Sequence, residues 1–183
     1  MRAVILALLT GLVGAALLHI VIILALPQFT GRDAYTKVMA LAEPNRFVPL
    51  PNTQQDGAAL VNDDPFLRVA VCSFSIAAAP VRFQARSEVP LWTLSIYDVD
   101  SNEIFSMNDK TSVAGDLDLV IATPVQLVAL RKALPDALSE SILAEMPHED
   151  GYAVLRALSP AASFEDEARN FLAEASCDEV EGR

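Results

Sequence analysis

Basic residues, glycine, histidine and cysteine are all scarce in this sequence, and each shortage argues against a class of function. The chain has 13 Lys and Arg residues against 24 Asp and Glu residues. Arg2 is the only charged residue in the first 30 positions, so the remainder carries 12 basic and 24 acidic side chains. A domain with that balance repels nucleic acids and anionic lipid headgroups. We therefore expect no nucleic-acid partner.

The scarcity of glycine, histidine and cysteine also removes the common catalytic and cofactor-binding motifs. The seven glycines form no phosphate-binding run, and no G-x-S-x-G motif is present. The two histidines and two cysteines are too dispersed along the chain to give the ligand spacing of a zinc site. We expect no catalytic residue, no cofactor and no metal, and we interpret the chain as a non-catalytic protein.

The chain does have one long apolar run, from Ala3 to Leu26. As a helix it is about 36 Å long at 1.5 Å per residue, which exceeds the ~30 Å hydrocarbon core of a bilayer. A cleaved signal peptide has a shorter apolar region of ~7–15 residues, followed by a small-x-small site. Here Pro27 and Gln28 follow instead. This favours an uncleaved transmembrane anchor over residues 1–30, a juxtamembrane helix and Pro-rich linker over 31–60, and a globular domain over 61–183.

Basic residues flank the apolar run on both sides and do not decide its orientation. Arg2 precedes it, and Arg32, Lys37 and Arg46 follow. Long domains translocate largely regardless of charge, and the chain carries two cysteines that are able to pair outside the cytosol. We predict that the domain lies outside the cytoplasm.

Small residues recur every four positions in the anchor, at Ala7, Gly11 and Ala15, with His19 next in the series. They share one helix face, where small side chains allow a second helix to approach and a polar group can bond across the contact. This face predicts a homodimer or a companion membrane protein. The alternative is an Ala/Gly-rich anchor whose His19 reaches headgroup water.

The two cysteines, Cys72 and Cys177, are far apart in the sequence. Cys72 lies in an apolar, strand-like run and Cys177 follows a predicted C-terminal helix. A disulfide would close a loop of about 100 residues and stabilise the fold by up to ~4–5 kcal/mol. Two unrelated thiols are the alternative, with Cys72 acting as a small buried apolar side chain.

The globular part changes from a two-residue period to a helical one. Alternating or apolar runs predict strands at 66–76, 81–85, 91–97, 104–107 and 117–121, and a central strand at 152–158. Capping signals predict helices that begin at Thr123 and Ser163, and a further helix is expected over 136–146. We predict a short helix over 33–42 and a frayed tail over 178–183. The fold class is α+β: a mainly antiparallel β-sheet or sandwich with C-terminal helices.

One hairpin holds most of the polar side chains that can form a site. Asp98, Asp100, Asn102 and Asp109 take the first, third, fifth and twelfth places of a calcium loop. Glu103 occupies the place that needs glycine, which favours an acidic hairpin tip instead. Arg82 and Arg86 with Trp92 and Tyr97 suggest a pocket for an anionic or sugar ligand, or else a solvated strand face and core aromatics. The candidate ligand or partner surface therefore comprises Arg82, Arg86, Trp92, Tyr97, Asp98, Asp100, Asn102, Asn108 and Asp109.

A resemblance extends over nearly the whole chain. The segment Trp92-Thr93-Leu94-Ser95-Ile96-Tyr97-Asp98, followed by Asn108-Asp109-Lys110, resembles the paired bacterial domains of unknown function twelve-fourteen and twelve-fifty-four. The strand Val69-Ala70-Val71-Cys72 and the terminal Ala175-Ser176-Cys177 resemble short membrane-anchored alphaproteobacterial members of that group. Thr93 and Lys110 stand where Ser and Arg are commoner. The resemblance implies a β-rich domain and a companion protein with the other domain, and carries over no catalytic residue.

The leading hypothesis is a single-pass protein of the inner (cytoplasmic) membrane, with its domain on the periplasmic side, that acts through a partner. The alternative is a membrane-surface enzyme or small-ligand-binding domain that uses the hairpin region from Trp92 to Asp109.

Overall fold

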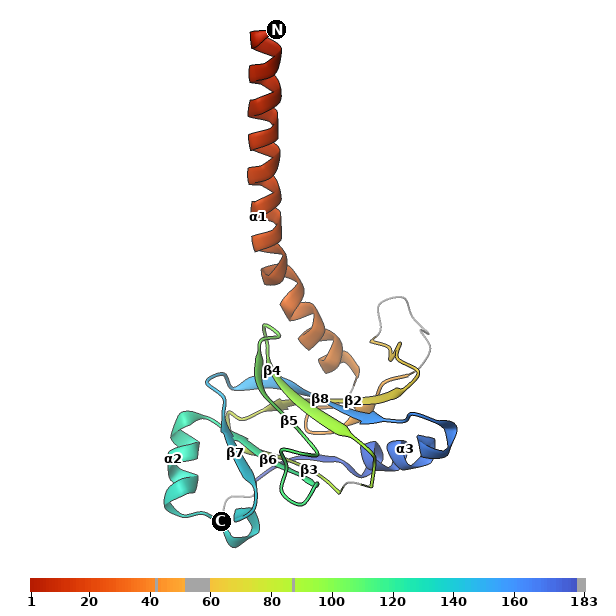
Figure 1. Cartoon of the computed structure of the whole chain (residues 1–183). Coiled ribbons are helices and arrows are strands. Elements are labelled where there is room, and N and C mark those ends of the chain that lie inside the picture. The colour runs from red at the N-terminus through yellow and green to blue at the C-terminus, as the bar shows by residue number, and fades with distance from the viewer. Residues whose placement is uncertain (42, 52–59, 87, 181–183) are drawn as a thin grey trace.

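The protein consists of one long helix that stands on a two-layer β domain (Figure 1). The computed structural model describes residues 1–41, 43–51, 60–86 and 88–180. Helix α1 (Arg2–Leu41) contains the segment Arg2–Leu26, which has a mean hydropathy of 2.5 and is not buried against the rest of the protein. By length and composition this segment is able to cross a membrane, as the sequence predicted.

Helix α1 continues through the position where the sequence predicted separate segments. The predicted helix over 33–42 is present as far as Leu41, but it is the end of α1 and not a separate element. Position 42 and residues 52–59 of the predicted linker lie outside the described residues. Pro27 falls within the helix. A proline removes one backbone hydrogen bond without ending a membrane helix, and it commonly bends one. In Figure 1 the lower part of α1 is inclined toward the β domain.

Two sheets form the domain. Sheet A has the order β1-β2-β8-β4-β5, and every neighbouring pair is antiparallel. Its strands are β1 (Val48–Pro49), β2 (Leu67–Ser75), β8 (Asp150–Leu158), β4 (Trp92–Asp98) and β5 (Glu103–Asn108). Sheet B has the order β7-β6-β3-β9, with strands β7 (Ile142–Glu145), β6 (Leu117–Ala122), β3 (Val81–Ala85) and β9 (Ser176–Glu179). The predicted α+β class and the central position of the 152–158 strand are confirmed.

The core lies between the two sheets and follows the two-residue period of the strands. Trp92, Phe74 and Phe83 are among its largest fully buried side chains. The rings of Phe74 in sheet A and Phe83 in sheet B meet edge to face, 5.2 Å apart. Each large apolar side chain buried this way contributes roughly 1.5–3 kcal/mol. The alternate residues point out of the sandwich, so each sheet has an outer face with a chemistry of its own.

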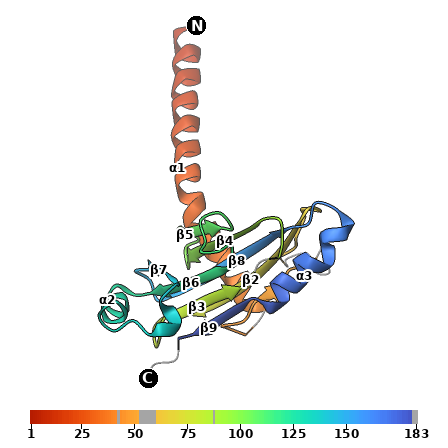
Figure 2. The same cartoon turned by 60° about the horizontal axis from the view of Figure 1, so that its bottom comes forward.

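Two α-helices lie at opposite ends of sheet B, as Figure 2 shows. Helix α2 (Pro124–Lys132) has the predicted capping box, in which Thr123 and Gln126 bond reciprocally. It connects β6 to β7, the one parallel pair in the described sheets. Helix α3 (Glu165–Glu174) buries Ala168, Phe171 and Leu172 against the core.

The helix predicted over 136–146 is wrong. A single 3-10 turn, η1 (Asp136–Leu138), is followed by strand β7. The Ile-Leu-Ala-Glu segment of β7 has no strong preference for a strand, but pairing with β6 satisfies its backbone and buries Ala144. This tertiary contact outweighs local helix propensity.

The start of the last helix and the chain end also differ from the prediction. A 3-10 turn, η2 (Ala162–Phe164), leads into α3, whose cap position Phe164 makes no side-chain cap bond. The predicted Ser163–Asp166 box is therefore wrong. Asp178 and Glu179 belong to β9 and pair with β3, so they are not frayed; residues 181–183 lie outside the described residues.

Candidate functional site

The residues predicted to form one ligand pocket are distributed over both sheets. Arg82 lies on β3 and Arg86 follows it, in sheet B, whereas Trp92 and Tyr97 belong to β4 in sheet A. Trp92 points into the core, where it is fully buried and its Nε1 donates to the carbonyl oxygen of Gly115 at 2.8 Å. Tyr97 lies on the outer face of sheet A, where its ring stacks on Tyr152. The structure does not bring these four side chains together.

The hairpin tip directs its carboxylate inward. Asp98 is only 2 % exposed, and its oxygens accept bonds from the backbone N–H groups of Asp100 and Asn102 and from the Asn102 amide, at 2.8–2.9 Å. Among the described residues, no three His, Cys, Asp or Glu side chains are placed to hold a metal ion together. The Asp98 carboxylate therefore stabilises the turn from within, as an acidic hairpin tip.

The other end of the hairpin is a turn of the same kind. The Asn108 side-chain oxygen accepts from the backbone N–H groups of Lys110 and Thr111, at 3.0 and 3.1 Å. Asp109 follows it, and its backbone N–H donates to the carbonyl oxygen of Trp92. Both ends of the hairpin thus use their polar groups to fix the backbone.

A row of tyrosines receives the end of α1 on the outer face of sheet A. Tyr152 lies between Tyr97, at a ring distance of 5.1 Å, and Tyr35 of α1, at 6.5 Å. Val38 of α1 packs beside them on Val71 and is 2 % exposed. Burial raises the pKa of Tyr152, and its hydroxyl group bonds to Ser101 Oγ at 3.0 Å. We call this surface the anchor face, defined by Val71, Ser73, Ser95, Tyr97, Tyr152 and Val154.

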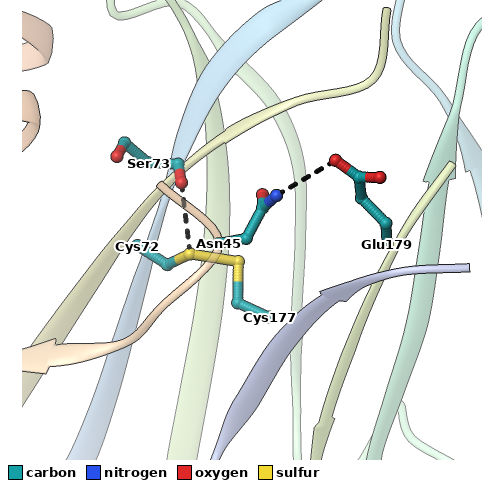
Figure 3. Close-up of a disulfide and its surroundings, with 5 residues drawn as sticks. All are labelled: Asn45, Cys72, Ser73, Cys177 and Glu179. Carbon is teal, nitrogen blue, oxygen red and sulfur yellow. Dashed lines mark hydrogen bonds between the residues drawn. A yellow bond between two sulfur atoms is a disulfide. The ribbon is translucent and has the colours of Figure 1, made fainter. Parts of the chain in front are cut away.

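The disulfide joins the two sheets at the side of the sandwich (Figure 3). Cys72 of β2 is bonded to Cys177 of β9, and both residues are 1 % exposed. The chain after α1 covers this side: the Asn45 backbone N–H donates to the Ser73 carbonyl oxygen, and the Asn45 amide donates to Glu179. Of the two alternatives left open by the sequence, the structure has the bridge.

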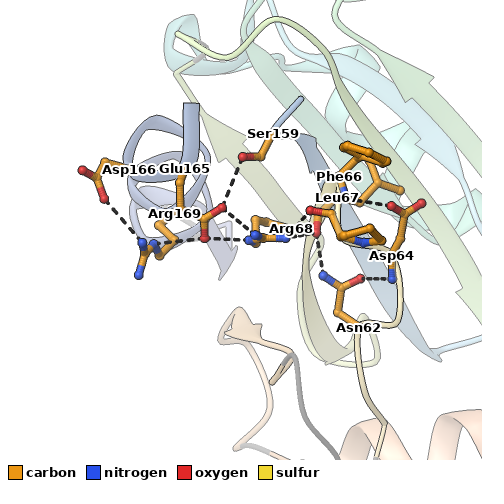
Figure 4. A network of polar contacts seen from close by, with 10 residues as sticks. Asn62, Asp64, Phe66, Leu67, Arg68, Ser159, Glu165, Asp166 and Arg169 are labelled. Atoms are coloured by element: carbon orange, nitrogen blue, oxygen red, sulfur yellow. Dashed lines mark hydrogen bonds and ion pairs between the residues drawn. The ribbon is translucent and has the colours of Figure 1, made fainter. Parts of the chain in front are cut away.

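A polar network ties α3 to the beginning of β2 (Figure 4). Arg68 Nε donates to Glu165 Oε1 at 2.7 Å, and Arg68 Nη2 contacts Glu165 Oε2 at 2.5 Å. Ser159 also donates to this carboxylate. The hydrogen bond from Arg68 holds the pKa of Glu165 below its ordinary value. With both groups partly screened by solvent, this network orients α3 more than it stabilises the fold.

The outer face of sheet B carries two adjoining cavities. A cavity of about 850 Å³ lies between α2, η1, β3 and β9, and a second of about 490 Å³ adjoins it. Gln84 and Ser176 line both cavities. We call the two together the trough.

One ion pair organises the floor of the trough. The Arg82 guanidinium makes two bonds of 2.8 Å to the Asp118 carboxylate and donates to the Ala137 carbonyl oxygen at 2.9 Å. Ser141 donates to the same carboxylate. The hydrogen bond to Asp118 raises the pKa of Arg82. The guanidinium is therefore held in contacts within the protein. Arg86 and Asp116 are in the smaller cavity.

Sequence reasoning identified Arg82 and Arg86 but missed Asp118, Asp178 and the trough itself. The available signal was the polar side chains that alternate with apolar ones in β3 and β6. That alternation predicts that one face of the sheet points away from the core. It does not predict that α2 and η1 make a wall beside it.

Comparison with known proteins identifies the fold and no more. No known family model matches this sequence, and no curated protein is significantly similar to it. The structure is similar to the crystal structure of the VPA0106 protein from Vibrio parahaemolyticus, with a TM-score of 0.61 at 13% identity over 85% of this chain and 37% of that chain. An uncharacterized protein from Burkholderia cenocepacia gives a TM-score of 0.41 at 14% identity, over 62% of this chain and 32% of that one. This chain thus spans about a third of the length of either protein.

Proposed function

We propose that this protein is a single-pass inner-membrane protein whose β domain works on the periplasmic side, as a non-catalytic accessory or interaction protein with a partner. The observation that carries the proposal is the continuity of α1. One helix runs from the apolar segment Arg2–Leu26 to Val38 and Tyr35 on the anchor face. A cleavable signal peptide does not need to pack on the folded domain. A membrane helix that packs on its domain also orients that domain on the membrane.

Two further observations support the proposal. The disulfide between Cys72 and Cys177 is a type of bond that persists outside the cytosol. The resemblance to the paired domains twelve-fourteen and twelve-fifty-four favours a companion protein. The hairpin alternative is less well supported, because Trp92 and Asp98 are buried and bonded within the fold.

The test uses the full-length chain with a C-terminal tag, expressed in bacteria. We expect it in the membrane fraction, resistant to carbonate extraction, and cleaved by protease added to spheroplasts. The intact mass of the extracted chain should include residues 1–27. Affinity purification in mild detergent should recover a partner in stoichiometric amount. A mature chain that begins near residue 28 contradicts the anchor.

A parallel screen tests the alternative function. The purified full-length protein is heated with metabolites, sugars and calcium while its unfolding is followed. A rise of several degrees with one ligand, together with no recovered partner, would favour a ligand-binding domain or an enzyme.

A further inference from the structure

We propose that the trough on the outer face of sheet B is the docking site for a cationic, partly apolar peptide segment of a partner protein. The inference rests on the proposed function, because it names the surface and the chemistry through which the partner is held. At about 850 Å³ and about 490 Å³, its two adjoining cavities are each in the size range of binding sites.

The walls of the larger cavity are apolar. Leu130 of α2, with Ala133 and Pro135 beyond the helix, forms one side, and Val180 lies after β9 on the other. Such walls give affinity to apolar side chains and little to a small hydrophilic ion. The floor offers Gln84 and Ser176, which are able to bond to a peptide backbone or a polar side chain.

The charges around the trough are predominantly negative. The positive charge of Arg82 is paired with Asp118. The acidic lining residues are Asp116, Asp118, Asp136, Glu140, Glu174, Asp178 and Glu179, against Arg82 and Arg86. Asp136, Asp178 and Glu174 are exposed. Opposite charge on the partner therefore accelerates and orients docking.

This charge selects among the occupants. A second copy of the chain would present the same acids and repel the first. An anionic lipid surface would also be repelled. In Figure 1, α2 and β3, which border the trough, lie on the side of the domain away from α1. A polypeptide with Lys or Arg beside apolar residues fits both the walls and the charge.

The test measures binding of a labelled peptide to the full-length protein in phosphatidylcholine nanodiscs, with empty nanodiscs subtracted. The probe is a seven-residue peptide of alternating Lys and Leu. A peptide of alternating Glu and Leu controls for apolar binding, and spermine as competitor controls for charge alone. We expect the Lys–Leu peptide to bind and its binding to weaken with added salt. The Glu–Leu peptide should not bind, and spermine should not displace the Lys–Leu peptide completely.

The matched variants change the same total charge at different places. Asp136→Lys with Asp178→Lys alters the trough, whereas Asp63→Lys with Glu167→Lys alters exposed acids elsewhere on the domain. We expect the first pair to weaken peptide binding about tenfold at low salt and the second to change it less than about threefold. Leu130→Ser should weaken binding without changing its salt dependence.

Three results would overturn the inference: equal losses in both charge variants, complete displacement by spermine, or no binding at about 1 mM peptide. Membrane affinity purification separates this failure from failure of the proposed function. A partner that is retained by the Asp136→Lys/Asp178→Lys variant would leave the proposed function standing and the trough unused.

Discussion

One outer face of the sandwich is neutral and buried, whereas the other is charged and open. In both sheets, inward and outward side chains alternate along the strands. On the anchor face, the central residues Ser73, Tyr152 and Ser95 are neutral and buried, and the end of α1 packs beside them. On sheet B, the corresponding strand positions carry Arg82, Asp118 and Asp178, and the face opens into the trough. The strand period determines which side chains point outward. The outward side chains are neutral where α1 packs on sheet A, and charged where sheet B opens into the trough.

The largest effect is expected from the bond that holds the two sheets together. Replacing both Cys72 and Cys177 by alanine should lower the free energy of unfolding by about 4–5 kcal/mol, because the bridge closes a loop with a sequence separation of 105. Urea denaturation followed by Trp92 fluorescence measures this loss. Reductant should destabilise the wild type to a similar extent and leave the double variant unchanged. Equal stability of the two proteins would show that the bridge does not constrain the sandwich.

A smaller loss is expected where α1 meets the anchor face. Val38→Ala removes two buried methyl groups from the contact with Val71 and should cost about 1–2.5 kcal/mol in unfolding free energy. The matched control is Val128→Ala on α2, where the side chain is 53% exposed. Thermal unfolding of the full-length protein in detergent compares them. If both variants unfold at the wild-type temperature, α1 does not stabilise the domain.

The apolar part of α1 is expected to have a weaker contact of its own. Ala7, Gly11, Ala15 and His19 lie on one face and are exposed along the isolated helix. If this face packs on another helix, Gly11→Leu and His19→Leu should each weaken the helix–helix association by about 0.6–2 kcal/mol. The yield of crosslinked dimer or partner should fall accordingly. Leu12→Ile, on a different face, is the control. Unchanged yield in both variants would remove the predicted interface.

The smallest effect is a pH dependence at the network of α3. The pKa of Glu165 is lowered in the folded protein from an ordinary value of 4.5, so its stabilisation is present above pH 4.5 and is lost as the pH falls through the lowered pKa. Glu165→Gln should therefore unfold at a lower temperature than the wild type at pH 7, by a degree or two. The difference should vanish in acid. In an Arg68→Gln background the same Glu165→Gln change should show a smaller trend, because the largest cause of the lowered pKa is absent. A constant difference at all pH values would contradict the role of Arg68.

The sequence predicted those parts of the structure that depend on local patterns. The apolar length of α1, the alternation in β3 and β4, and the Thr123 capping box are each encoded in a few consecutive residues. Strand β7 was missed because pairing with β6, and not its own residues, makes it a strand. Gly151 shows the same limit: a Cβ there would collide with the Tyr97 carbonyl oxygen of the neighbouring strand, a contact between positions far apart in sequence. The trough depends on the placement of α2, η1 and β9 beside β3, and it was missed for that reason.

We propose that α1 orients the domain, with the anchor face toward the membrane and the trough away from it. The direct measurement is energy transfer to acceptor dyes on lipid headgroups, with the full-length chain in nanodiscs and a donor at Glu103→Cys or Asp136→Cys. Glu103 begins β5, whose hairpin with β4 lies on the side of α1 in Figure 1. Asp136 lines the larger cavity of the trough. We expect clearly stronger transfer from position 103 than from position 136. Equal transfer from both positions, or stronger transfer from position 136, would contradict this orientation.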